Sequence, residues 1–149
     1  MTSKATTLVA QAKQWASYYG SYTTGPEGAV LTAPLRFRAS WDDNNADAIA
    51  DLFVENGSLL IGDEQLKGRE QIREYMAAAF AGGLKGSKLV ETPVEIRLLT
   101  EDTAVAITEG GMVSDGGTEP DKQTRTMWVA AKRDGDWWLV SYQSSPVKG

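Results

Sequence analysis

The side chains that most often carry out nucleophilic, metal-dependent or acid–base chemistry are largely missing from this sequence. Its 149 residues include no His and no Cys. This excludes thiolate catalysis, disulfides and His-activated nucleophiles, and it removes the commonest metal ligands. We therefore expect no metal site and no bound cofactor, and any proton transfer falls to other groups, carboxylates above all.

Three charged residues in predicted strands are the candidates for a catalytic role, namely Glu95, Glu109 and Arg125. A strand carboxylate that points into an apolar interior has a raised pKa and can act as a base. Glu109 also lies next to the flexible pair Gly110-Gly111. The alternative is that these side chains lie on a solvated face of the sheet, where charged strand residues usually lie.

Helical spacing of apolar residues dominates the first half of the chain, and strand patterns dominate the second half. Helices are predicted within residues 6–20, 27–43, 46–53 and 69–81. Pro34 lies inside the second of these and predicts a kink or a restart. Strands are predicted over residues 58–61, 84–99, 103–114, 123–133 and 136–147. Helices followed by a run of antiparallel strands indicate one domain with an α+β layer fold.

Asp134-Gly135 is a strong signal for a two-residue hairpin turn, and such a turn sets the register of the last two strands. One face then carries the pairs Lys132–Trp137, Ala130–Leu139, Trp128–Ser141 and Thr126–Gln143. The other face carries Arg125, Met127, Val129 and Ala131 opposite Ser144, Tyr142, Val140 and Trp138. Both faces are apolar, so the face that does not cover the helices needs a cover of its own. We expect a homodimer through the outer sheet face; the alternative is that the N-terminal helix covers it.

The charge balance argues against two classes of partner. Twenty acidic and fifteen basic residues give a net charge of −5, and the basic residues do not cluster. We therefore expect no binding to nucleic acid and none to membrane surfaces. No apolar stretch approaches the ~20 residues of a membrane span, and the first twenty residues lack the apolar run of a secretory signal. Cytoplasmic localisation is the expectation.

Several short motifs follow one another in a characteristic order. They are Trp41-Asp42, the DAIADLF segment 47–53, Glu55-Asn56-Gly57, Gly68-Arg69-Glu70-Gln71-Ile72, Asp102-Thr103-Ala104-Val105-Ala106, Arg133-Asp134-Gly135-Asp136-Trp137 and Tyr142-Gln143-Ser144-Ser145. Over residues 26–147 the sequence resembles the SnoaL-like branch of the nuclear-transport-factor-two-like superfamily, and within it the SgcJ/EcaC-type proteins of enediyne antibiotic biosynthesis. The resemblance implies a cone-shaped, strongly curved, mostly antiparallel sheet wrapped over three or four helices. An N-terminal helical arm, residues 1–25, would precede the cone domain, residues 26–149.

The same resemblance implies a pocket that opens at the wide end of the cone. By position, its lining comprises Phe37, Trp41, Phe53, Leu60, Met76, Phe80, Trp128, Trp137, Leu139 and Gln143. Ordinary core packing is the alternative for each of these residues. Gln143 stands where many relatives have a His, and a glutamine cannot titrate. The apolar segment 59–61 stands where ketosteroid-isomerase-like relatives carry a general-base Asp.

Two functions of different classes fit this sequence. The first, favoured by the missing titrating groups, is a protein that binds a hydrophobic polyketide (an enediyne or polyene intermediate) in an apolar pocket during enediyne biosynthesis or handling. The alternative is a cofactor-free polyketide cyclase or isomerase that uses a buried carboxylate as general base. A scaffold with a vestigial pocket is a third interpretation. The sequence leaves open whether the protein is an enzyme.

Overall fold

Four helices and six strands make up residues 25–147, the part of the chain that the computed structural model describes. The helices are α2 (Gly25–Val30), α3 (Thr32–Asp42), α4 (Ala46–Asp51) and α5 (Gly68–Ala81). The strands are β1 (Phe53–Ile61), β2 (Glu64–Lys67), β3 (Lys88–Thr100), β4 (Thr103–Val113), β5 (Thr124–Arg133) and β6 (Asp136–Pro146). The predicted N-terminal arm, residues 1–25, lies outside the described residues except for Gly25.

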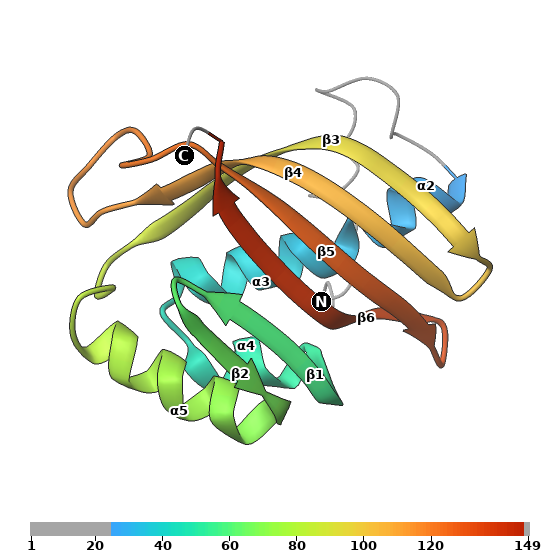
Figure 1. Cartoon of the computed structure of the whole chain (residues 1–149), viewed down its shortest axis with the longest axis horizontal. Helices are drawn as coiled ribbons and strands as arrows, with labels where there is room; N and C mark the ends of the chain where they lie inside the picture. The colour runs from blue at the N-terminus through green and yellow to red at the C-terminus, as the bar shows by residue number, and fades with distance from the viewer. Residues whose placement is uncertain (1–24, 148–149) are drawn as a thin grey trace, which may run out of the picture.

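The six strands form one sheet in the order β2-β1-β6-β5-β4-β3. All neighbouring strands are antiparallel except β1 and β6, which are parallel. The sheet curls over α3, which contacts β3 and β6, while α5 packs against β1 and α4 (Figure 1). The predicted α+β architecture, a curved and mostly antiparallel sheet over a few helices, is confirmed.

Pro34 explains why the first long predicted helix is two helices. A proline has no N–H, so residue 34 cannot donate to the carbonyl of Val30, where α2 ends. The helical hydrogen bonds resume one residue later, with the Leu35 amide donating to the Leu31 carbonyl at 3.0 Å. Pro34 thereby lies in the first turn of α3, and the predicted restart is confirmed.

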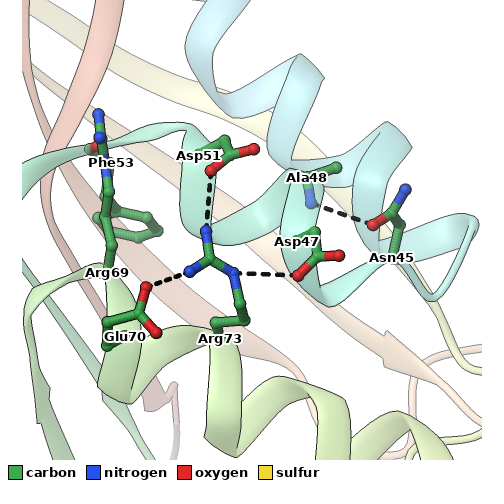
Figure 2. A network of polar contacts seen from close by, with 8 residues as sticks. All are labelled: Asn45, Asp47, Ala48, Asp51, Phe53, Arg69, Glu70 and Arg73. Atoms are coloured by element: carbon green, nitrogen blue, oxygen red, sulfur yellow. Dashed lines mark hydrogen bonds and ion pairs between the residues drawn. The ribbon is translucent and has the colours of Figure 1, made fainter.

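Charged side chains fasten α4 to α5 (Figure 2). Arg73 of α5 lies 3.0 Å from carboxylate oxygens of Asp47 and of Asp51 in α4, and it also pairs with Glu70 in its own helix. Asn45 caps the start of α4 with its side-chain oxygen. Because the three carboxylates are largely exposed, the cluster orients the two helices more than it stabilises the fold.

A one-residue bulge in β3 reverses its alternation halfway along the strand. Pro93 pairs with Thr108 and Glu95 pairs with the next residue of β4, so Val94 is the inserted residue. Odd-numbered side chains point inward before the bulge and outward after it, which places Glu91 inside and Glu95 outside. β3 is the last strand of the described sheet, the kind of position where a strand tolerates a proline.

The turn between β5 and β6 forms as predicted. Asp134 and Gly135 both have positive φ angles, 53° and 84°, which a two-residue turn of this type requires. The flanking strands pair in the predicted register as far as Ala130 and Leu139.

A second one-residue bulge, at Val140, shifts the register beyond that point. The observed pairs are Val129–Ser141, Trp128–Tyr142, Met127–Gln143 and Thr126–Ser144. The predicted pairs Trp128–Ser141 and Thr126–Gln143 are therefore wrong. The sequence pattern shows no sign of the inserted residue, because Val140 suits a regular strand.

The outer face of the sheet is consequently less apolar than predicted. Tyr142 is buried on the inner face, whereas Gln143 is exposed on the outer face. Leu60, Gln143, Met127 and Ile107 form one cross-strand row on the outside. A homodimer through this face stays a prediction.

Several elements differ in their bounds from the predicted ones, and β3 begins at Lys88 rather than at residue 84. The helix expected over residues 46–53 ends at Asp51, and β1 begins at Phe53 rather than at residue 58. The short strand β2 was not predicted. Among the described residues, no helix combines the length and the apolar character that crossing a bilayer requires.

Replacing Gly110 tests the close approach of β3 and β4 next to Glu91. A Cβ at position 110 would lie 1.7 Å from the Val90 carbonyl oxygen, whereas one at Gly83 would meet no atom within 4 Å. We expect Gly110→Ala to lower the free energy of unfolding by about 2 kcal/mol or more. Gly83→Ala is the control and should change it little. Urea unfolding measures both variants, and equal stabilities would contradict the predicted steric conflict.

Replacing Met127 tests the dimer. This side chain is 44% exposed at the centre of the outer row. If two copies join through this face, Met127→Glu would place like charges in the interface and shift the sedimentation coefficient toward that of a monomer. Lys85→Glu, in the loop after α5, should leave it unchanged. A wild-type protein that sediments as a monomer at all accessible concentrations would contradict the predicted homodimer.

Candidate functional site

A carboxylate lies in the apolar interior between the curved sheet and the helices. Glu91 of β3 is only 4% exposed, although the residues around it form the hydrophobic core. Its Oε2 atom accepts a hydrogen bond of 2.9 Å from the Thr108 hydroxyl on the neighbouring strand β4. Glu91 shares the inner face with Leu89 on the segment of β3 before the bulge at Val94, and its partner across the ladder is Gly110.

The hydrogen bond to Glu91 is the end of a short buried chain. The Trp128 indole on β5 donates from Nε1 to the Thr108 Oγ1 atom at 2.9 Å. Trp128 and Thr108 are 1% and 0% exposed, so the chain is shielded from solvent. The Trp128 ring is held by edge-on contacts with Phe37 and Tyr142, whose ring centroids lie 5.1 and 4.8 Å away. Three strands and α3 therefore position one carboxylate.

Burial changes how Glu91 titrates. Desolvation raises the pKa of the carboxyl from its ordinary 4.5 to about 7, and the Thr108 hydrogen bond and the nearby Arg38 of α3 only partly oppose this effect. At neutral pH the carboxyl is therefore populated in both forms, as an acid and as a base. A group with such a pKa is well suited to receive a proton and to return it.

Tyr142 complements Glu91 from β6. Its ring stacks on Phe37, with centroids 4.9 Å apart. Burial and the charge of Glu91 raise the pKa of the phenol, while hydrogen bonds with Ser144 and Thr126 act in the opposite direction. The phenol therefore stays neutral and can donate a hydrogen bond. Together, Glu91 and Tyr142 provide a base and a neutral hydrogen-bond donor in one apolar interior.

Eight of the ten predicted pocket residues lie together in the interior. They are Phe37, Trp41, Phe53, Met76, Phe80, Trp128, Trp137 and Leu139, and all belong to one buried cluster. Their rings contact one another: Phe37 and Trp41 lie 6.0 Å apart between centroids, and Trp41 and Phe80 lie 5.4 Å apart. These contacts are ordinary core packing, the alternative stated for each of these residues. Their role toward a ligand stays a prediction.

Leu60 and Gln143 lie on the outer face, and their predicted inward orientation is wrong. The bulge at Val140 turns Gln143 outward, and Leu60 pairs with it across the ladder. Both border a shallow surface cavity of about 210 Å³. The residues that line it are Leu60, Ile107, Arg125, Met127, Gln143, Ser144 and Ser145.

The three predicted catalytic residues also lie outside. Glu95 is exposed on the outer face of β3, because it follows the bulge. Arg125 binds Glu109 across β4 and β5, with nitrogen–oxygen distances of 2.5 and 2.9 Å to the same carboxylate oxygen. This ion pair lies on the solvated face, as the alternative interpretation held. The inward orientation that a buried base needs is therefore not found for these residues.

Sequence reasoning missed Glu91, Thr108 and Tyr142. The signal for Glu91 was its position two residues after Leu89, with Pro93 following: a proline inside a strand favours a bulge, and a bulge reverses the faces beyond it. Tyr142 carried no comparable signal. Among residues 25–147, no group of three or more acidic side chains is placed to hold a metal ion.

The buried carboxyl predicts an unusual dependence of stability on pH. Because the pKa of Glu91 is raised in the folded state, the stability that its proton supplies is complete below pH 4.5 and is lost as the pH rises through 7. Glu91→Gln removes this dependence. The variant should gain stability relative to wild type between pH 4 and pH 8, by a total on the order of 3 kcal/mol.

The matched control is Glu95→Gln on the outer face of the same strand. We expect this variant to follow the wild-type curve when the free energy of unfolding is measured by urea denaturation at each pH. Parallel curves for wild type and Glu91→Gln would contradict the raised pKa.

Solved structures share the fold of this chain. A putative calcium/calmodulin-dependent protein kinase II association domain from Xanthomonas campestris is 29% identical, with a TM-score of 0.68 and coverage of 84% of this chain and 90% of the other. An NTF2-like protein with a cystatin-like fold from Novosphingobium aromaticivorans is 19% identical, with a TM-score of 0.70 and coverage of 100% and 93%. A ketosteroid isomerase-like protein from Erwinia carotovora atroseptica is 15% identical, with a TM-score of 0.67 and coverage of 85% and 99%.

The sequence itself also has a family match. No curated protein matches the chain. The SnoaL-like domain, however, matches residues 28–143, a range that begins in α2, ends in β6 and includes Glu91, Thr108, Trp128 and Tyr142. This range covers well over half of the 149 residues. The protein is therefore a member of the SnoaL-like domain family, with the NTF2-like fold.

Proposed function

We propose that the protein catalyses proton transfer on an apolar carbonyl compound without a cofactor, as an isomerase or cyclase does, with Glu91 as general base. The observation that carries this proposal is a carboxyl that is 4% exposed, has a pKa of about 7 and is oriented by a hydrogen bond from Thr108. The description of the Erwinia neighbour as ketosteroid isomerase-like is consistent with this class of reaction.

The reaction follows from the two groups in the interior. The Glu91 carboxylate takes a proton from the carbon next to the substrate carbonyl, so that the C–H bond breaks and an O–H bond forms on Glu91. The Tyr142 phenol donates a hydrogen bond to the carbonyl oxygen, where negative charge develops. Glu91 then returns the proton to another carbon, which completes an isomerisation. In a cyclase, the enolate carbon would instead attack a second carbonyl carbon of the substrate. The π bond of that carbonyl breaks as the C–C bond forms, and Glu91 returns its proton to the resulting alkoxide oxygen.

The apolar surroundings of Glu91 favour an apolar substrate. Trp128 is linked to Glu91 through Thr108, and Phe37 packs against both Trp128 and Tyr142. Arg38 is the charged side chain of α3 that acts on the pKa of Glu91. An unsaturated polyketide intermediate, as the sequence resemblance suggests, satisfies this chemistry. Enediyne and polyene precursors are the substrates to test first.

A second candidate function is binding of such a polyketide without chemical change. The cluster of aromatic rings around Phe37 favours it, because unsaturated ligands stack on such rings. The two candidates differ in one measurable respect, namely whether a substrate C–H bond is broken.

Exchange of substrate protons in D₂O, followed by NMR, distinguishes the two candidates. We expect wild-type protein to accelerate exchange next to the carbonyl of β,γ-unsaturated ketones or polyene ketones, with a rate that rises as Glu91 ionises around pH 7. Glu91→Gln should lower the rate by a factor of about 10² to 10⁴. Glu95→Gln, on the outer face of the same strand, should match wild type.

Two outcomes would contradict the proposed catalysis. Undiminished exchange by Glu91→Gln would remove Glu91 from the reaction. Saturable quenching of Trp fluorescence by the same compounds, without any exchange above buffer, would leave binding as the function.

A further inference from the structure

We propose that Thr108 and Trp128 are positioning residues that leave a single oxygen of Glu91, Oε1, to exchange protons with the substrate. The part of this inference that concerns the substrate rests on the proposed function. The part that concerns the orientation of Glu91 rests on two hydrogen bonds of 2.9 Å, from Trp128 to Thr108 and from Thr108 to Glu91.

The direction of this chain is fixed by chemistry. An indole N–H can only donate, so the bond from Trp128 Nε1 uses a lone pair of the Thr108 oxygen. The Thr108 hydroxyl has one hydrogen, and its other partner is the Oε2 atom of Glu91, an acceptor. The hydrogen therefore points at Glu91. Thr108 is fully buried, so its hydroxyl is held in this orientation.

A fixed donor makes the two carboxyl oxygens unequal. A proton on Oε2 would face the hydrogen of Thr108, which places two donors against each other. The proton of neutral Glu91 therefore resides on Oε1, while Oε2 remains an acceptor in both forms. The reactive oxygen is thereby held in one place relative to the strand, and such orientation is worth a large part of a rate enhancement.

The other groups that face Glu91 do not provide this asymmetry. Arg38 on α3 lowers the pKa of the carboxyl through its charge, and Tyr142 on β6 is coupled to Glu91 in the same way. Neither has a hydrogen bond to Glu91 in the described residues. Gly110, opposite Glu91 on β4, has no side chain. Substitutions in the hydrogen-bonded chain from Trp128 through Thr108 to Glu91 therefore test this asymmetry.

Titration of Glu91 without any substrate tests the inference. Infrared difference spectra between pH 5 and pH 9 report the C=O stretch of the protonated carboxyl, and Glu91→Gln assigns the band. Thr108→Val should move the titration midpoint upward by about one unit or more, a tenfold fall in the acid dissociation constant, because the ionised form loses its donor. The band should also move to higher frequency, since the carbonyl oxygen loses the same donor.

Two further variants complete the experiment. Thr108→Ser keeps the hydroxyl and should restore the wild-type midpoint. Trp128→Phe removes the donor that fixes the orientation of the Thr108 hydroxyl, so this hydroxyl can rotate and accept a hydrogen bond from neutral Glu91. The midpoint should therefore rise, but less than in Thr108→Val. If Thr108→Val does not fold, Trp128→Phe and Thr108→Ser still provide the comparison.

An unchanged or lowered midpoint in Thr108→Val, or a wild-type midpoint in Trp128→Phe, would overturn the inference. The outcome is independent of the proposed function, because no substrate is present. If the midpoints move as expected but proton exchange is absent, the proposed catalysis fails alone. If exchange is found and the midpoints do not move, the positioning role fails alone.

Discussion

The side chains of a β-strand alternate between its two faces, and one inserted residue reverses that alternation for everything beyond it. In this protein two such insertions, Val94 and Val140, decide which polar groups enter the apolar interior. The first leaves Glu91 inside and places Glu95 outside. The second turns Tyr142 inward and Gln143 outward. The acid–base character of the interior therefore depends on two backbone irregularities rather than on a sequence motif.

A buried carboxyl opposes folding, and this structure compensates for it only in part. Removing Glu91 from water disfavours its ionised form, while the Thr108 hydroxyl and the charge of Arg38 favour that form. The balance leaves the pKa near neutrality. A solely structural role would be better served by an apolar residue in the same position, since the neighbouring side chains belong to the hydrophobic core. Because Thr108 and Arg38 offset only part of the desolvation of the Glu91 carboxylate, a functional role explains this residue better than a structural one.

The sequence was informative where local rules dominate. Apolar spacing predicted the α+β layers, Pro34 predicted the break between α2 and α3, and Asp134-Gly135 predicted the turn between β5 and β6. It was uninformative about the faces of β3 and β6, because bulges depend on how a strand meets its neighbours in the curved sheet. The sequence therefore predicts the aromatic interior but not its polar residues, and it offers Glu95 and Glu109 as candidate bases in place of Glu91.

The bulge and the proline of β3 also affect the border of the sheet. β3 is the last strand on its side of the described sheet. An incoming strand would find no amide hydrogen at Pro93 and a backbone kink directly after it, which prevents continuous pairing. Pro93 and the bulge at Val94 therefore oppose edge-to-edge aggregation through β3. The same bulge separates the buried Glu91 from the exposed Glu95.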